Sequence, residues 1–181
     1  MKFKDYTVDE LEICREEFVR YFTSKNFDET ADWSNEVFSW FRETRLPEIK
    51  VYPIADGSTL GEFMVDLCHT SYPLDVTGQG ELEWYGVAVN RVCRVRLALE
   101  CEWGKPASKK TTLAMVLADA CKLAVLRSQV KVMVFSSYAY DDPDEFPKFL
   151  HGIRSCHDDH DPWLWIDMRS DGEIRSDIFR N

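Results

Sequence analysis

Two glutamates, Glu100 and Glu102, alternate with apolar residues in the segment "RLALECEWGKPASKK", which covers residues 96–110. In a β-strand, side chains two residues apart point to the same face, so both carboxylates share one side of the strand. Such a pair is either the solvated side of a half-buried strand or a set of ligands for a divalent cation. The pattern alone leaves both interpretations open.

A third acidic residue, Asp66, lies in the apolar segment "EFMVDLCH" and shares a strand face with Met64 and Cys68. Burying an ionised carboxylate costs free energy unless a positive charge compensates it. That charge could come from an arginine on a neighbouring strand or from a divalent cation. We expect Asp66 on one strand and Glu100 on an adjacent strand to be able to bind such a cation together.

Glu83 is the alternative to Asp66 as the first acidic ligand. A hairpin that turns at residues 90–91 would bring the segment 81–83 opposite residues 98–100. Glu83 would then lie close to Glu100, and Asp66 would not be needed. The spacing of the residues leaves this alternative open.

One charged pair, Asp119 and Lys122, interrupts the apolar sequence "LAMVLADACKLAVL". Side chains three residues apart are neighbours on a helix, and a local ion pair of this kind contributes roughly 0.3 kcal/mol. The apolar surroundings favour a more specific role for the lysine. Three further lysines follow the strand directly and form a basic patch that could contact the phosphates of nucleic acid: Lys105, Lys109 and Lys110.

The surrounding sequence predicts an α/β architecture that would position these residues. Apolar residues at helical spacing predict helices over 8–24 and 33–45. Period-two segments then predict four strands of an antiparallel meander at 48–55, 61–72, 82–89 and 92–103. A helix that is apolar on nearly every side, and therefore buried, precedes the central strand "VKVMVFSSY", which a crossover makes parallel to the preceding strand.

The C-terminal part is expected to complete the sheet, with a helix at 143–155 and a turn at Asp171–Gly172 between two strands. In the polar segment "SCHDDHD" at 155–161, every residue after the serine is a cysteine, histidine or aspartate that can bind metal. Adjacent side chains cannot all point at one ion, and the spacing is not that of a structural zinc site. We therefore expect a solvated loop there.

Length, charge and cysteine content limit the classes of protein that the chain can form. A chain of 181 residues with 45% apolar residues is enough for one domain, divided into N-terminal helices (1–47), a core (48–136) and a C-terminal completion of the sheet (137–181). The net charge of −10 repels nucleic acid, so a nucleic-acid partner requires a local basic patch. Six cysteines without a CxxC pair, and no apolar run of roughly 18 residues, predict a cytoplasmic protein without a membrane partner.

The order of these parts resembles the PD-(D/E)XK nuclease superfamily, which implies a restriction-endonuclease-like αβββαβ core with a mixed central sheet flanked by helices. The resemblance rests on the strand with Asp66, the strand "LALECEWG", the helix with "DACKL" and the strand "VKVMVF", within residues 48–136. The chain looks most like uncharacterised bacterial members that carry a Glu-x-Glu-Trp motif followed by an Asp-x-x-Lys-Leu helix.

This resemblance implies metal-dependent hydrolysis of phosphodiester bonds in nucleic acid. It implies that Asp66 and Glu100 bind magnesium or manganese, and it favours Asp66 over Glu83 because aspartate is the usual residue at the first position. Glu102 stands where most members have a catalytic lysine. Some members have glutamate there, and in others the following helix supplies the lysine, so Lys122 is the candidate replacement. The expected catalytic residues are therefore Asp66, Glu100, Glu102 and Lys122.

The missing lysine and the acidic charge support a different function, that of a non-catalytic acidic binding protein. Such a protein would be an inactive nuclease fold or an immunity-like or antitoxin-like partner that neutralises a basic protein. A nuclease needs a basic rim around Asp66 and Glu100, whereas a neutralising protein presents a broad acidic face. The oligomeric state is left open between a monomer and the homodimer that nucleases cutting both strands often form.

Overall fold

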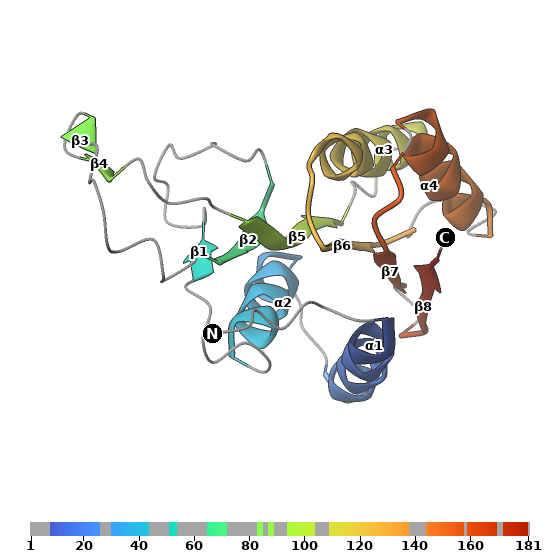
Figure 1. Ribbon diagram of the computed structural model, residues 1–181. Coiled ribbons are helices and arrows are strands. Elements are labelled where there is room, and N and C mark those ends of the chain that lie inside the picture. The colour runs from blue at the N-terminus through green and yellow to red at the C-terminus, as the bar shows by residue number, and fades with distance from the viewer. Residues whose placement is uncertain are drawn as a thin grey trace.

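The chain forms a mixed β-sheet with helices on both faces (Figure 1). A computed structural model describes residues 8–25, 30–43, 51–53, 65–71, 83–84, 87–88, 94–103, 109–137, 144–157, 159–169 and 172–180. The described helices are α1 (Val8–Thr23), α2 (Thr30–Glu43), α3 (Lys109–Val125) and α4 (Glu145–Cys156). The described strands are β1 (Val51–Pro53), β2 (Leu67–Ser71), β3 (Glu83–Trp84), β4 (Val87–Ala88), β5 (Arg94–Glu102), β6 (Val130–Phe135), β7 (Trp163–Met168) and β8 (Ile174–Phe179).

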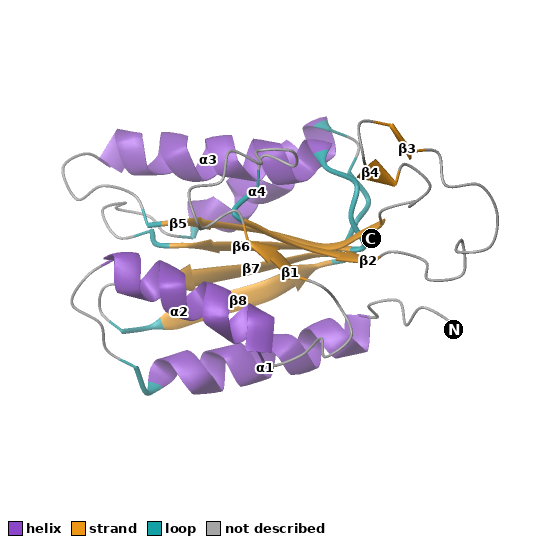
Figure 2. Ribbon diagram, turned by 90° about the vertical axis from the view of Figure 1, so that its left-hand side faces the viewer, coloured by secondary structure: helices purple, strands orange, loops and turns teal. Residues whose placement is uncertain are grey.

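Six of these strands form the main sheet in the order β1-β2-β5-β6-β7-β8. Strand β2 is antiparallel to both of its neighbours, β1 and β5. Strands β5, β6 and β7 run parallel to one another, and β8 is antiparallel to β7. Helices α3 and α4 make the two crossovers and cover one face, while α1 and α2 cover the other (Figure 2). Right-handed crossovers that add strands in one direction place both helices on the same face. The α/β class and the mixed sheet flanked by helices are confirmed.

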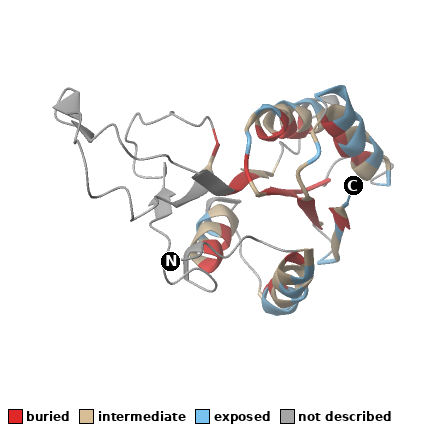
Figure 3. Ribbon diagram, in the orientation of Figure 1, coloured by how far each residue is buried: buried red, intermediate tan, exposed pale blue. Residues whose placement is uncertain are grey.

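The sheet separates two apolar layers. Leu97 and Leu99 of β5 pack in the layer that includes α1 and α2, whereas Ala98 packs in the layer with α3 and α4. Strand β6 is buried at every position, and buried residues concentrate along the parallel strands (Figure 3). A strand covered by helices on both faces needs apolar residues on both, which explains why every residue of β6 except Lys131 is apolar. None of the helices in the described ranges is long and apolar enough to cross a membrane.

The antiparallel meander predicted from the sequence is only partly correct. In place of the strand expected at 82–89, β3 and β4 form a separate two-stranded sheet, and β2 pairs directly with β5. Both edges of β5 are occupied, one by β2 and the other by β6, so no further strand can pair with it. The alternative that placed 81–83 opposite 98–100 is therefore wrong. The predicted parallel pairing of β5 with β6 is confirmed.

Helix α3 is less buried than its apolar sequence predicts. One side of the helix is buried in the layer that it shares with the sheet and α4, through Val116, Ala120 and Leu123. The other side is in solvent, where Ala118 and Val125 are exposed. A helix that packs on one face of a sheet leaves its outer side in solvent, and an exposed alanine costs little because its side chain is small. The prediction of a helix buried all round was therefore wrong, and α3 has both a buried and a solvent-facing side.

The C-terminal strands form the predicted hairpin, since β7 and β8 are antiparallel and the backbone N–H of Arg169 donates to the carbonyl of Glu173 just beyond their paired residues. Gly172 in this turn has a φ of 86°, a value that favours glycine because it has no Cβ. The amide of Gly172 donates to the carbonyl of Arg169, which closes the turn.

The segment 155–161 is not simply a solvated loop, because Asp159 is buried beneath it. The ammonium of Lys131, on β6, lies 2.6 Å from Oδ2 of Asp159 and 3.2 Å from Oδ2 of Asp161. The side chains of Lys131 and Asp159 are 1% and 4% exposed. The indole N–H of Trp163 also donates to Asp159, at 2.7 Å. A buried ammonium needs counter-charges, and this loop supplies them, which corrects the prediction for Asp159.

Candidate functional site

Asp66 and Glu100 are brought together by the pairing of β2 with β5. Leu67 lies opposite Leu99 in this pair, and Asp66 precedes Leu67 directly, so it falls at the position facing Glu100. The backbone N–H of Cys101 donates to Oδ2 of Asp66 at 2.9 Å, which holds the carboxyl group against β5. Of the two candidates for the first acidic ligand, Asp66 is therefore the one beside Glu100.

Glu100 points from the centre of the sheet toward α3, and its side chain is only 1% exposed. The ammonium of Lys122 lies 3.4 Å from its Oε2 atom. Its other oxygen, Oε1, is buried and accepts no hydrogen bond from any residue that the structure describes. A buried acceptor without a partner costs roughly 1–3 kcal/mol. This oxygen therefore needs a proton or a cation to compensate it.

The pKa of Glu100 is raised to about 9, chiefly because burial disfavours the ionised form. The negative charges of Asp66 and Asp119 raise it further, and Lys122 offsets part of the rise. Burial also raises the pKa of Asp66, against the lowering effect of the hydrogen bond from Cys101. A protonated Glu100 can donate to Asp66, and that hydrogen bond lowers the pKa of Asp66. The negative charges of Asp66 and Glu100, if both were ionised, would thus be only partly compensated by Lys122.

Lys122 reaches the pair from the inner side of α3. Its ammonium lies 2.6 Å from Oδ1 of Asp119, and its side chain is 38% exposed. Partial burial acts to lower the pKa of Lys122, but the hydrogen bond with Asp119 and the charges of Glu100 and Asp66 raise it overall. Lys122 is therefore a protonated cation at neutral pH. The sequence predicted the Asp119–Lys122 pair, but it carried no signal that Asp119 would lie near Asp66 and Glu100.

Glu102, the fourth expected catalytic residue, lies at the end of β5. Glu102 is the last residue of β5, is partly buried, and lies on the strand face of Glu100 by alternation. Its carbonyl accepts the N–H of Ser136, at 3.1 Å. Lys105 lies outside the described residues, as do the side chains of Lys109 and Lys110 at the start of α3.

The carboxyl groups of Asp66 and Glu100 could bind a divalent cation of the kind that needs only one or two ligands from the protein. Within the described ranges, no three or more His, Cys, Asp or Glu side chains converge as ligands of one metal ion. Magnesium often uses only one or two carboxylates and completes its coordination with water and substrate phosphate oxygens. Asp66 and the unpartnered oxygen of Glu100 supply that number of hard oxygen ligands.

Another buried carboxylate, Asp167, lies at the carboxyl end of β7, next to the end of β6. The backbone N–H and hydroxyl of Ser137 both donate to it, at 2.8 and 2.6 Å. Burial raises the pKa of Asp167, while these two hydrogen bonds lower it. Both oxygens of this carboxylate therefore accept a hydrogen bond, which indicates that it joins the ends of two parallel strands. The sequence analysis did not identify this residue.

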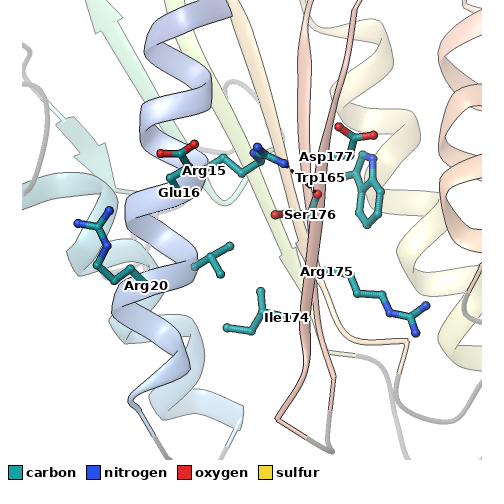
Figure 4. A pocket seen from close by; sticks show the side chains of 9 residues that line it. Arg15, Glu16, Arg20, Trp165, Ile174, Arg175, Ser176 and Asp177 are labelled. Atoms are coloured by element: carbon teal, nitrogen blue, oxygen red, sulfur yellow. Dashed lines mark hydrogen bonds between the residues drawn. The ribbon is translucent and has the colours of Figure 1, made fainter.

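A pocket of about 820 Å³ lies along α1 and the edge strand β8, on residues that do not contribute to the carboxyl pair. Arg15 and Glu16 lie on one side of β8, and Trp165 and Asp177 lie on the other (Figure 4). The space therefore extends around the edge of the sheet and does not enclose a ligand. Its lining mixes both charge signs, and Arg15 is already paired with Glu12 at 2.8 Å.

No known protein supplies a function for this chain by similarity. No protein-family model matches it, and no curated protein or solved structure is significantly similar to it. The buried, incompletely partnered carboxyl pair beside a protonated lysine is consequently the feature from which a function can be argued.

Proposed function

We propose that this chain is a divalent-metal-dependent phosphodiesterase that hydrolyses nucleic acid on a PD-(D/E)XK-like core. The observation that carries the proposal is the buried Glu100 carboxyl, which lies beside Asp66 and has one oxygen without a hydrogen-bond partner in the described part of the chain. The order of elements supports it, because β2, which Asp66 directly precedes, and β5, which carries Glu100, come before a helix with Lys122 and then a parallel strand. The resemblance described above implies the same order.

In this proposal Asp66 and Glu100 bind magnesium or manganese through their carboxylate oxygens. The bound ion supplies Lewis-acid stabilisation of the negative charge that develops on the phosphate during hydrolysis. Binding of a cation also compensates Glu100, whose raised pKa reports the cost of its ionised form. Because the pKa of Glu100 is raised, a cation that binds this carboxyl must displace its proton, so binding should strengthen as pH rises.

Lys122 and Glu102 have different chemical roles in the proposed reaction. Lys122 is protonated at neutral pH, so it cannot accept a proton; it donates a hydrogen bond to the attacking water or to a phosphate oxygen. Glu102 ends the same strand as Glu100, and its carboxylate is the group that accepts a proton from water in this proposal. Glutamate at this position therefore provides the base, and Lys122 provides the positive charge.

Calorimetric titration with magnesium and with manganese tests the metal site. We expect the wild-type protein to bind, the Glu100→Ala and Asp66→Ala variants to lose binding, and Glu16→Ala to bind as the wild type does. Glu16 is exposed on α1, so its removal changes the net charge equally without touching the site. No binding by the wild type at millimolar metal would count against the proposal.

Cleavage assays then test the reaction. Purified wild-type protein is incubated with supercoiled plasmid, single-stranded DNA and RNA, with either metal or with chelator. Cleavage should require metal and should disappear in Glu100→Ala and Glu102→Gln. Metal binding without cleavage of any of the three substrates would refute the nuclease assignment while leaving the metal site intact.

The alternative is a non-catalytic acidic protein that binds a basic partner. The net charge of −10 favours it, and so does the ammonium of Lys122, which already partly compensates Glu100. This alternative predicts that neither metal binds and that complexes with small basic proteins form and weaken steeply with salt. Salt-insensitive or absent complexes would argue against it.

A further inference from the structure

The ammonium of Lys122 lies unequally between two carboxylates. It is 2.6 Å from Oδ1 of Asp119 but 3.4 Å from Oε2 of Glu100, so the closer pairing is with Asp119. Asp119 belongs to the same helix, three residues earlier, and its side chain is 14% exposed. This spacing on a helix keeps the two side chains within reach of each other whatever binds at Glu100.

We infer that Asp119 is a positioning residue that draws the ammonium of Lys122 away from Glu100 and so keeps the Asp66–Glu100 pair open to a divalent cation. The inference rests on the proposed metal site. Without Asp119, the nearest partner described for Lys122 would be Glu100. The ammonium would then compete with the metal for the same carboxylate.

The charges within the cluster support this assignment. Among the residues that the structure describes, the carboxylates of Asp66, Glu100 and Asp119 lie around the ammonium of Lys122, so these four side chains, when ionised, carry an excess of negative charge that a divalent cation can balance. The Asp119–Lys122 pair is nearly neutral as a unit. A tethered cation close to a ligand lowers metal affinity by repulsion, and pairing it with Asp119 reduces that repulsion.

A double-mutant cycle on metal affinity tests the inference. Manganese binding is measured by calorimetry for the wild type, Asp119→Asn, Lys122→Met and the double variant. We expect Asp119→Asn to weaken binding about tenfold, because the released ammonium moves to Glu100. In the Lys122→Met background the same substitution should change affinity by less than about twofold.

Other outcomes overturn the inference in distinguishable ways. Equal weakening by Asp119→Asn in both backgrounds would mean that Asp119 binds the metal itself or acts only by its charge. No weakening in either background would mean that Asp119 does not position Lys122. Absence of Glu100-dependent binding in the wild type would refute the proposed metal site, and this inference with it.

A matched substitution controls for net charge and stability. Asp32→Asn on α2 removes one exposed carboxylate on the opposite face of the sheet, so it changes the net charge as Asp119→Asn does. It should leave manganese affinity unchanged. We expect Asp119→Asn and the wild type to have closely similar thermal unfolding midpoints, measured with chelator. If Asp119 only stabilised the helix, the substitution would lower the midpoint, and its effect on metal affinity would not depend on Lys122.

Discussion

Replacing Glu100 by glutamine should stabilise the metal-free protein at neutral and alkaline pH. The substitution keeps the shape of the side chain, and the amide can face Lys122 with its oxygen and donate toward Asp66. Glutamine has no proton to lose, so the cost of ionising a buried carboxyl disappears. Glu100 is 1% exposed, and its pKa is raised from 4.5 to about 9, chiefly by burial.

The raised pKa of Glu100 determines whether the free energy of unfolding rises or falls with pH. The folded protein holds the Glu100 proton more tightly than the unfolded chain does, so the unfolded chain loses it first as pH rises. The stability associated with this proton is complete below the unfolded pKa and declines as pH rises toward the folded pKa. The slope is at most about 1.4 kcal/mol per pH unit, so at neutral pH the wild type has lost about 3 kcal/mol of stability through Glu100.

Urea denaturation with chelator, at several pH values between about 5 and 9, measures this difference. The free energy of unfolding of Glu100→Gln relative to wild type should increase steadily with pH across this range. Glu16→Gln, which changes an exposed residue on α1, should show no such trend. A difference that is constant with pH, or a glutamine variant less stable than wild type near pH 8, would refute the account of Glu100 as a costly buried carboxyl.

Three further substitutions test the packing and polar contacts around the sheet, each by urea denaturation. Lys131→Met leaves Asp159 buried without its cation and should lower the free energy of unfolding by roughly 3–5 kcal/mol; a loss below about 1 kcal/mol would contradict the buried ion pair. Ser137→Ala removes a hydrogen bond that lowers the pKa of Asp167 and should cost about 1–2 kcal/mol, more at high pH, where the carboxyl is ionised, than at low pH, where it is protonated; a loss independent of pH would argue against a hydrogen bond that favours the ionised carboxylate. Leu150→Ala on α4 empties a fully buried site and should cost about 3 kcal/mol; near-neutrality would mean that α4 does not pack as described.

Much of the secondary structure is readable from local periodicity. Alternation along "VCRVRLALECEW" places Glu100 on the strand face opposite Leu97 and Leu99, and the structure has them so. Helical spacing likewise pairs Asp119 with Lys122. These features depend on neighbours within four residues, and the geometry of a helix or strand relates such neighbours in a fixed way.

Other features depend on contacts between segments far apart in the chain. Asp66 and Glu83 are both acidic residues in segments with a strand-like pattern, and only the pairing of β2 with β5 places Asp66, directly before β2, beside Glu100. The packing of α3 on the sheet brings Lys122 to Glu100. In the same way, the loop after α4 folds over Lys131, a contact that no sequence period encodes.

The sequence by itself therefore determined the class of fold, the strand that carries Glu100 and Glu102, and the helix that carries Lys122. The tertiary structure alone decided which acid is the neighbour of Glu100, how closely Asp119 and Lys122 approach it, and how deeply the pair is buried. The physical reason is range. Backbone geometry sets the periodicity of side chains within a segment. Strand pairing and burial depend instead on contacts between distant segments, because each strand edge and each sheet face can be covered by only one of them.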